Sequence, residues 1–151
     1  MASDYLLLRK PLDTPLLAPV WPDGIAPARF ANVDSRAIHA VLEIAFPGGQ
    51  IAAFADWYGN LTTDFEFDPT LCVPALAQDG SVAGLVQCWT SDFIKDFAVA
   101  PAHRGKGLGE ALMLHTFALF AARGSAHVDL KVETSNQTAR RLYARLGMIE
   151  V

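Results

Sequence analysis

A run of glycines and basic residues carries the clearest chemical signal in the sequence. Arg104-Gly105-Lys106-Gly107-Leu108-Gly109 lies between an expected strand at 93–100 and an expected amphipathic helix at 108–122. A strand that enters a glycine-rich turn before a helix exposes unpaired backbone N–H groups and the positive end of the helix dipole. These groups bind anions, so the run predicts a diphosphate site.

Two better-known glycine loops have spacings that this run does not meet. A P-loop needs Gly-Lys followed directly by Ser or Thr, whereas Lys106 is followed by Gly107. The dinucleotide fingerprint reads G-x-G-x-x-G, whereas Gly105, Gly107 and Gly109 read G-x-G-x-G. The spacing therefore disfavours both nucleotide-binding folds.

The remaining pattern is Arg-x-x-Gly-x-Gly preceded by Phe97-Ala98-Val99-Ala100-Pro101. It resembles the acetyl-CoA signature of the GNAT N-acetyltransferases, and an ordinary strand-to-helix turn is the alternative. The resemblance implies that acetyl-CoA is the acyl donor, that the turn's amides hold the CoA diphosphate, and that the preceding strand pairs with the pantetheine arm. The implied cofactor contacts are Phe97, Ala98, Val99, Arg104, Gly105, Lys106, Gly107, Leu108, Gly109 and Glu110.

A second motif near the C-terminus strengthens this resemblance. Residues 128–132 alternate as a strand, and Ser135-Asn136 then opens a helix that ends at Gly147. The helix is similar to the family's block Asn-x-x-Ala-x-x-Leu-Tyr-x-x-x-Gly-Phe, with Met148 in place of the final Phe. The resemblance covers roughly residues 70–149, and its motif positions here are Asn136, Ala139, Leu142, Tyr143 and Gly147.

The resemblance also implies catalytic roles. Acetyl transfer from a thioester needs a polarised carbonyl and a proton for the departing thiolate. The backbone amide of Val99 is expected to donate to the acetyl oxygen, and the Tyr143 phenol to protonate the sulfur. Asn136 is expected to bond the pantetheine arm, or alternatively only to cap its helix.

The general base is not evident from the sequence. Strand alternation places Phe93, Lys95, Phe97 and Val99 on one face, and none of these is a natural base. A water relay, or an acceptor amine of low pKa, needs no dedicated base. The remaining candidates are carboxylates, each more often solvated surface than catalytic: Asp56, Asp64, Glu66, Asp92, Asp96 and Glu133.

Composition restricts the class of protein. The chain of 151 residues has the size of one domain, and its net charge of −4 argues against nucleic-acid binding. Cys72 and Cys88 are isolated in apolar stretches, and the four histidines follow no ligand spacing, so we expect buried thiols and no metal. No apolar run approaches the length of a membrane span, and residues 5–8 are too short for a signal peptide, which predicts a cytoplasmic protein without a membrane partner.

Organisation along the chain follows from proline and hydrophobic patterning. Five of the nine prolines fall within 11–27 and predict an extended connector, so we divide the chain into a strand and connector at 1–26 and a GNAT domain at 27–151. The expected fold is α/β, with a mixed twisted sheet of six or seven strands and about four helices. The remaining expected elements are strands at 5–9, 28–31, 71–77 and 82–89, helices at 34–46 and 51–58, and a loop at 62–69.

The sheet is expected to be one strand short, because family members carry a final strand after the Gly-Phe block. The N-terminal strand resembles the inter-domain stretch of tandem members, including mycothiol synthase-like proteins. We expect this strand to fill the slot in its own sheet, or in a neighbour's by exchange within a homodimer, and an ordinary edge strand is the alternative.

The combined motifs predict transfer of acetyl from acetyl-CoA to a primary amine by direct attack, because no cysteine accompanies a histidine in either motif. The expected acceptor is a small molecule. The alternatives are a protein or peptide amine, and a CoA-binding module without catalysis.

Overall fold

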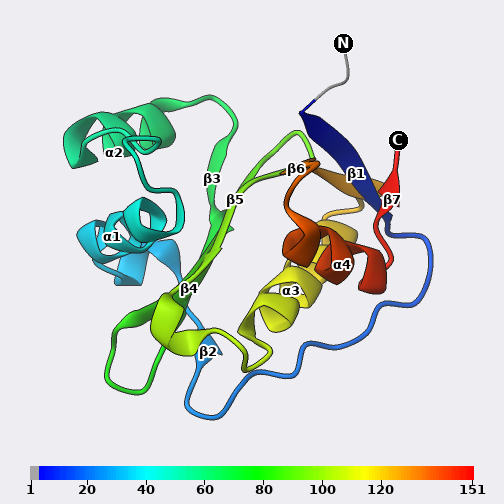
Figure 1. Ribbon diagram of the computed structural model, residues 1–151, viewed down its shortest axis with the longest axis horizontal. Helices are drawn as coiled ribbons and strands as arrows, with labels where there is room; N and C mark the ends of the chain where they lie inside the picture. The colour runs from blue at the N-terminus through cyan, green and yellow to red at the C-terminus, as the bar shows by residue number, and fades with distance from the viewer. Residues whose placement is uncertain (1–3) are drawn as a thin grey trace.

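Helices cover both faces of one seven-stranded sheet in the computed structural model, which describes residues 4–151 (Figure 1). The strand order is β2-β3-β4-β5-β6-β1-β7, antiparallel except between β5 and β6. The expected mixed sheet with four helices is confirmed. The strands are β1 (Tyr5–Pro11), β2 (Ala26–Pro27), β3 (Phe67–Leu76), β4 (Val82–Trp89), β5 (Phe93–Val99), β6 (His127–Glu133) and β7 (Ile149–Glu150).

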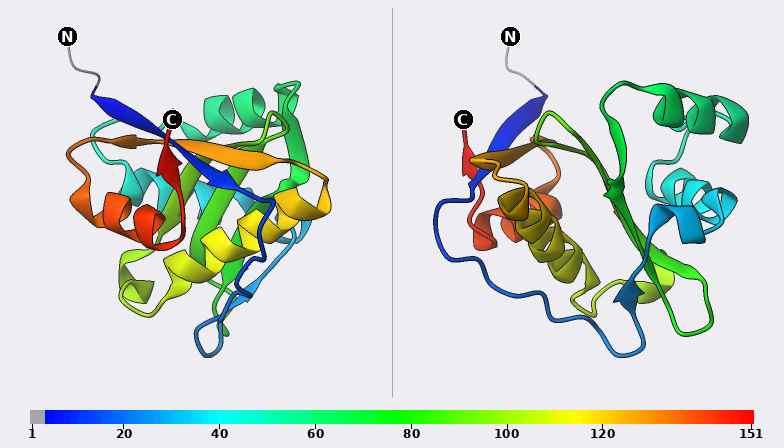
Figure 2. Two further views of the ribbon diagram at one scale, coloured as in Figure 1. Left: turned by 90° about the vertical axis from the view of Figure 1, so that its right-hand side faces the viewer. Right: turned by 180° about the vertical axis from the view of Figure 1, so that it is seen from behind.

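The helices form one layer on each side of the sheet, as the two views of Figure 2 also show. One layer holds α1 (Ser35–Ala45) and α2 (Phe54–Thr63), and the other holds α3 (Leu108–Ala122) and α4 (Gln137–Arg145). Two 3-10 turns, η1 (Phe30–Asn32) and η2 (Pro101–His103), join helices to strands. The third helix has the bounds that the sequence predicted.

Each layer encloses its own apolar core. Phe117 and Phe120 of α3 are fully buried against the sheet, and Ile38 and Leu42 of α1 are buried on the opposite face. The first helix begins where Asp34 caps it, with the carboxylate accepting from the Arg36 N–H at 2.9 Å. The spacing of apolar residues in α1 fixes which face that helix turns to the sheet. The expectation that residues 108–122 form an amphipathic helix is wrong in that respect, because α3 is apolar on nearly all sides.

Four expected elements between residues 26 and 77 need correction. The strand expected at 28–31 is absent, because the chain pairs with β3 only at Ala26–Pro27 and then turns into η1. The helix expected at 51–58 begins three residues later, since the carbonyl of Ala52 accepts from His39 at 2.8 Å and holds the preceding segment outside the helix. The loop expected at 62–69 is partly α2 and partly β3, and that strand starts at Phe67 rather than at residue 71.

The N-terminal strand lies inside the sheet. It pairs with β6 over its whole length and, at Leu8 and Arg9, with β7 on its other side. The strand belongs to its own sheet, as one alternative expected, but the expectation of a sheet one strand short is wrong, because Ile149–Glu150 forms a brief final strand. Exchange of β1 between subunits and the domain division at residue 26 stay predictions, and residues 1–3 lie outside the described residues.

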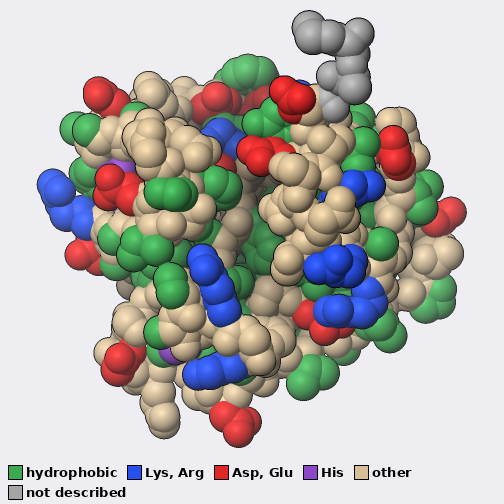
Figure 3. Space-filling model, viewed as in Figure 1, with side chains coloured by type: hydrophobic (Ala, Val, Ile, Leu, Met, Phe, Trp, Pro, Cys, Tyr) green, Lys and Arg blue, Asp and Glu red, His purple; other side chains and the backbone are tan. Residues whose placement is uncertain are grey.

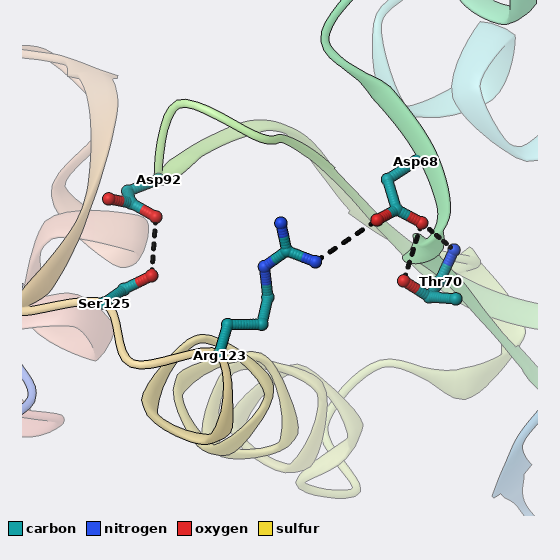
Figure 4. A network of polar contacts seen from close by, with 5 residues as sticks. All are labelled: Asp68, Thr70, Asp92, Arg123 and Ser125. Atoms are coloured by element: carbon teal, nitrogen blue, oxygen red, sulfur yellow. Dashed lines mark hydrogen bonds and ion pairs between the residues drawn. The ribbon is translucent and has the colours of Figure 1, made fainter.

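Side-chain contacts fix the C-terminal end of α3 (Figure 4). Arg123 donates to Asp68 of β3 at 3.2 Å, and Ser125 donates to Asp92 of the β4–β5 turn at 2.6 Å. A hydrogen bond from Thr70 and, less strongly, the Arg123 guanidinium lower the pKa of Asp68. Although exposed contacts of this kind contribute little stability individually, together they orient the helix whose other end carries the glycine run.

Leu8 tests how far the sheet depends on β1. Its side chain is only 7% exposed in the core beneath α3 and α4, so Leu8→Ala should lower the free energy of unfolding by about 2–5 kcal/mol. Leu17→Ala makes the same change in the connector at a residue that is 72% exposed, and should cost less than about 0.5 kcal/mol. Urea unfolding followed by circular dichroism measures both, and equal costs would contradict this role of β1.

Candidate acetyl-CoA site

The two parallel strands β5 and β6 pair only at their beginnings. Phe93 lies opposite Asp129 and Ile94 opposite Leu130, after which the strands separate. A cavity of about 500 Å³ occupies the opening, lined by both strands, by α4 and by the segment that follows α1. Figure 3 shows this face hollowed between the two halves of the molecule, with Lys and Arg side chains gathered around the hollow.

The free edge of β5 supplies backbone donors to this opening. The Ala100 N–H donates to the Ala83 carbonyl of β4 at 2.8 Å. Because N–H groups alternate between the two edges of a strand, those of Val99 and Phe97 point away from β4, toward the side where β6 has separated. Val99 therefore presents an unpaired amide where the sequence predicted a donor to the acetyl oxygen, although that role stays a prediction.

A β-bulge in β5 overturns the expected alternation of this strand. Gln87 pairs with Asp96, but the next residue of β4, Cys88, pairs with Ile94, so Lys95 is an extra residue. Phe97 and Val99 remain on the α3 face with Ile94, whereas Asp96 shares the α1–α2 face with Gln87. The prediction that Phe93, Lys95, Phe97 and Val99 share one face is wrong, because the bulge shifts the register by one residue.

The glycine run leads from β5 into α3 in an open conformation. Gly105 and Gly107 have φ of +76° and +85°, which only glycine adopts at little cost. Within the described part of the chain, the backbone N–H groups from Gly105 to Glu110 have no acceptor, and the first helical bond runs from the Ala111 N–H to the Gly107 carbonyl. The loop thus has the donors that a diphosphate needs.

Three contacts hold the glycine run and the start of α3 against β5 and α4. Arg104 donates through Nε to the Val99 carbonyl at 3.2 Å and so fastens the loop to the end of β5. Glu110, in the first turn of α3, lies 3.4 Å from Arg145 of α4. A Cβ added to Gly109 would lie 3.2 Å from the Phe97 ring, so glycine allows the helix to approach β5 closely. The loop, β5 and α4 are therefore fixed relative to one another.

Tyr143 of α4 lines the same cavity. It is 7% exposed, and its ring centroid lies 6.3 Å from that of Phe97 on β5. Burial raises the pKa of the phenol to about 12, so the group stays protonated over the physiological range. The structure thus brings a protonated phenol next to the strand that carries Val99.

Asn136 lines the cavity and also caps α4. Its Oδ1 accepts from the Ala139 N–H at 3.2 Å, which is the capping alternative that the sequence left open. This bond uses the amide oxygen and leaves the amide nitrogen for another partner, and a contact with the pantetheine arm stays a prediction.

The six candidate carboxylates lie in different places, and only two of them line the large cavity. Asp92 accepts from Ser125, and Glu66 accepts from the Ser91 N–H at 3.1 Å, so both stabilise turns. Asp96 and Glu133 line the large cavity together with Tyr143. Asp64 lines a smaller cavity beside it, and Asp56 lies in the first turn of α2.

His115 does not reach the cavity between β5 and β6. It is half-buried on α3 with its ring edge against Trp21, and burial lowers its pKa. The sequence reasoning missed Gln50, which lines both cavities from the segment between α1 and α2. The motif Pro47-Gly48-Gly49 marks that segment as a loop, but no local signal indicates that it faces β5.

Comparison with known proteins identifies the family to which the chain belongs. The model of the acetyltransferase (GNAT) family matches residues 35–148. A GCN5-related N-acetyltransferase from Sphaerobacter thermophilus superposes with a TM-score of 0.85 and 31% identity, over 97% of this chain and 48% of that one. The chain therefore belongs to the GNAT acetyltransferase family.

Relatives within the family differ in the acceptors that their names give. A streptothricin acetyltransferase of Streptomyces lavendulae is 38% identical over 48% of this chain and 41% of its own length. A Bacillus subtilis protein assigned as a ribosomal protein bS18-alanine N-acetyltransferase is 32% identical over 48% of this chain and 50% of its own. Several mycothiol acetyltransferases also match, in agreement with the resemblance noted in the sequence. This chain spans half or less of the length of these relatives.

Neither a metal-binding cluster nor a membrane-spanning helix is found among the described residues. Residues 4–151 contain no group of three or more His, Cys, Asp or Glu side chains placed to hold a metal ion. No helix among them has the length and apolar character needed to cross a bilayer.

The raised pKa of Tyr143 predicts how stability depends on pH. Its pKa rises from 10.0 to about 12 on folding, so its contribution is fully present below pH 10 and is lost as the pH climbs toward 12. Relative to Tyr143→Phe, the wild-type protein should lose about 2–3 kcal/mol of unfolding free energy across that window. Urea titrations of both proteins at pH 9 and pH 11.5 measure this difference, and a constant difference would contradict the burial of the phenol.

Proposed function

We propose that this protein transfers acetyl from acetyl-CoA to a primary amine, by direct attack of the amine on the thioester. The observation that supports this proposal is the row of unpaired N–H groups from Gly105 to Glu110 at the start of α3. These residues do not line the cavity between β5 and β6 themselves, but Gly109 lies against Phe97, which does. These amides, with Arg104 and Lys106 nearby, suit the CoA diphosphate. The pantetheine arm then lies along the free edge of β5 between this loop and Tyr143.

Two parts of the reaction have a candidate group at the site, namely the carbonyl oxygen that gains charge and the sulfur that leaves. The amine nitrogen gives up a proton and attacks the thioester carbonyl carbon, so that an N–C bond forms and the C–S bond breaks. The Val99 amide donates to the carbonyl oxygen as it gains charge, and the Tyr143 phenol protonates the departing sulfur. The nitrogen loses its second proton after the attack, and that proton restores the phenol. The products are an acetamide and CoA, and one proton returns to solvent for each ammonium consumed.

The acceptor is proposed to be a small molecule. Relatives named for streptothricin and mycothiol support this choice, while the relative named for a ribosomal protein supports the alternative of a protein amine. The net charge of −4 is compatible with a cationic acceptor, whereas the cavity lining itself is balanced, with Asp96 and Glu133 beside Lys95 and Lys131.

Tyr143→Phe tests the proposed proton donor. The change removes only the hydroxyl of a side chain that lines the cavity, so CoA affinity should remain while kcat falls about 10²- to 10⁴-fold. Thiol release from acetyl-CoA with a panel of primary amines gives kcat, and calorimetric titration with CoA gives affinity. If CoA binds but no amine elicits thiol release from the wild-type protein, the protein is a binding module and the proposed reaction is wrong.

Gly107→Ala tests the proposed diphosphate loop. Alanine disfavours a φ of +85° by about 1–2 kcal/mol, which should distort the loop and weaken CoA binding about 5- to 30-fold. Gly80→Ala is the matched control, because Gly80 has a φ of +87° in the β3–β4 turn and equally open surroundings. Both variants should lose similar stability, and only the first should lose CoA affinity. Equal affinities would exclude this loop as the anchor.

A further inference from the structure

A second cavity opens beside the first, on the α1–α2 side of the sheet. It has a volume of about 320 Å³ and shares Gln50, Lys95 and Asp96 with the cavity between β5 and β6. The two cavities therefore meet at the β-bulge. A group seated there can reach both the proposed thioester position and the second cavity.

A primary ammonium already occupies this meeting point. The Nζ of Lys95 lies 3.0 Å from Asp96 Oδ2 and 5.8 Å from the centre of the Trp89 ring. The Asp96 side chain is only 16% exposed, so the carboxylate is partly sheltered from water. A carboxylate beside an indole face suits a cation, and the chain's own lysine shows that a primary ammonium fits.

A second oxygen acceptor lies on the same face of the sheet. Gln87 is the cross-strand partner of Asp96, and side chains at paired positions extend from the same face. Its amide is 2% exposed, and Oε1 has no hydrogen-bond partner among the described residues. Because Gln87 lines neither cavity, this oxygen does not itself face a ligand at the meeting point.

The remaining wall of the second cavity is largely apolar. Trp57 and Leu61 of α2 are 9% and 5% exposed, and Ile51 and Trp89 complete that side. A volume of 320 Å³ is at the small end of the range for ligand pockets. The charged lining consists of Asp64 and Asp96 against Lys95, so it favours a cation over an anion.

We propose that the acceptor is a primary amine with a compact apolar or aromatic body. Its ammonium displaces Lys95 from Asp96, and its body fills the second cavity between Trp57 and Trp89. Lys95 is a specificity-determining residue that competes with the acceptor for the carboxylate. This inference rests on the proposed acetyl transfer and adds to it the substrate class and the group that selects it.

A pair of amines tests the substrate class. 2-Phenylethylamine and ethylamine share the ammonium, and only the first has a body that can fill the second cavity. With acetyl-CoA held at a saturating concentration, we expect the KM for 2-phenylethylamine to be at least 10-fold lower than the KM for ethylamine. Equal KM values, or a preference for 1,4-diaminobutane or for a peptide with a free N-terminus, would overturn it.

Two variants test the ammonium site. Asp96→Asn keeps the shape but removes the charge and should raise the KM for 2-phenylethylamine about 10- to 100-fold. Lys95→Met keeps the length of the stem but removes the competing ammonium, and should lower that KM about 3- to 10-fold. Neither change should move the KM for acetyl-CoA.

The double variant separates competition from a structural effect. If Lys95 acts only by occupying Asp96, Lys95→Met should no longer lower the KM when Asp96→Asn is already present. A full effect of Lys95→Met in the Asp96→Asn background, or an increase in KM in the single variant, would overturn the role given to Lys95. Thermal unfolding of all three variants shows whether each remains folded.

Failure of this inference differs from failure of the proposed function. Thiol release with ethylamine as readily as with 2-phenylethylamine refutes the substrate class and leaves acetyl transfer intact. Absence of thiol release with every amine, in wild type and variants alike, refutes acetyl transfer itself and the inference with it.

Discussion

The unpaired amides at the start of α3 are the feature on which the rest of the site depends. They stay in place because α3 is held at its middle and at its C-terminal end: Phe117 and Phe120 are buried, and Arg123 and Ser125 bond Asp68 of β3 and Asp92 of the β4–β5 turn. A helix held in this way can offer donors to an anion without first paying to order them. Residues 105 and 107 have positive φ angles, which favour glycine, and this backbone conformation leaves the donors exposed.

The residues of the proposed site lie where the pairing of β5 with its neighbouring strands becomes irregular. Separation of β5 from β6 after Ile94 frees one edge of β5, and the extra residue Lys95 turns Asp96 to the opposite face. The free edge is where the acyl donor is proposed to bind, and the Asp96 carboxylate lies where the acceptor is proposed to enter. A regular sheet would have paired those amides with β6, so the separation of the two strands is what leaves them free.

Local signals account for what the sequence could predict. The glycine run and the long apolar stretch that follows it gave the bounds of α3 at Leu108–Ala122, and Asn136 identified the start of α4. The bulge at Lys95, the two-residue strand β2 and the position of the segment around Gln50 depend on contacts with distant parts of the chain. Strand alternation cannot reveal a bulge, because the extra residue is defined only by its partner strand.

The most direct test of the central claim observes the amides themselves. In ¹⁵N-resolved spectra, addition of CoA should shift the amide signals of Gly105, Lys106, Gly107, Leu108, Gly109 and Glu110, and inorganic pyrophosphate should shift the same set at higher concentration. Pantetheine, which lacks the diphosphate, should leave these signals in place and shift those of Phe97 and Val99. If CoA binds while the signals from residues 105 to 110 do not move, the loop does not hold the diphosphate and the account is wrong.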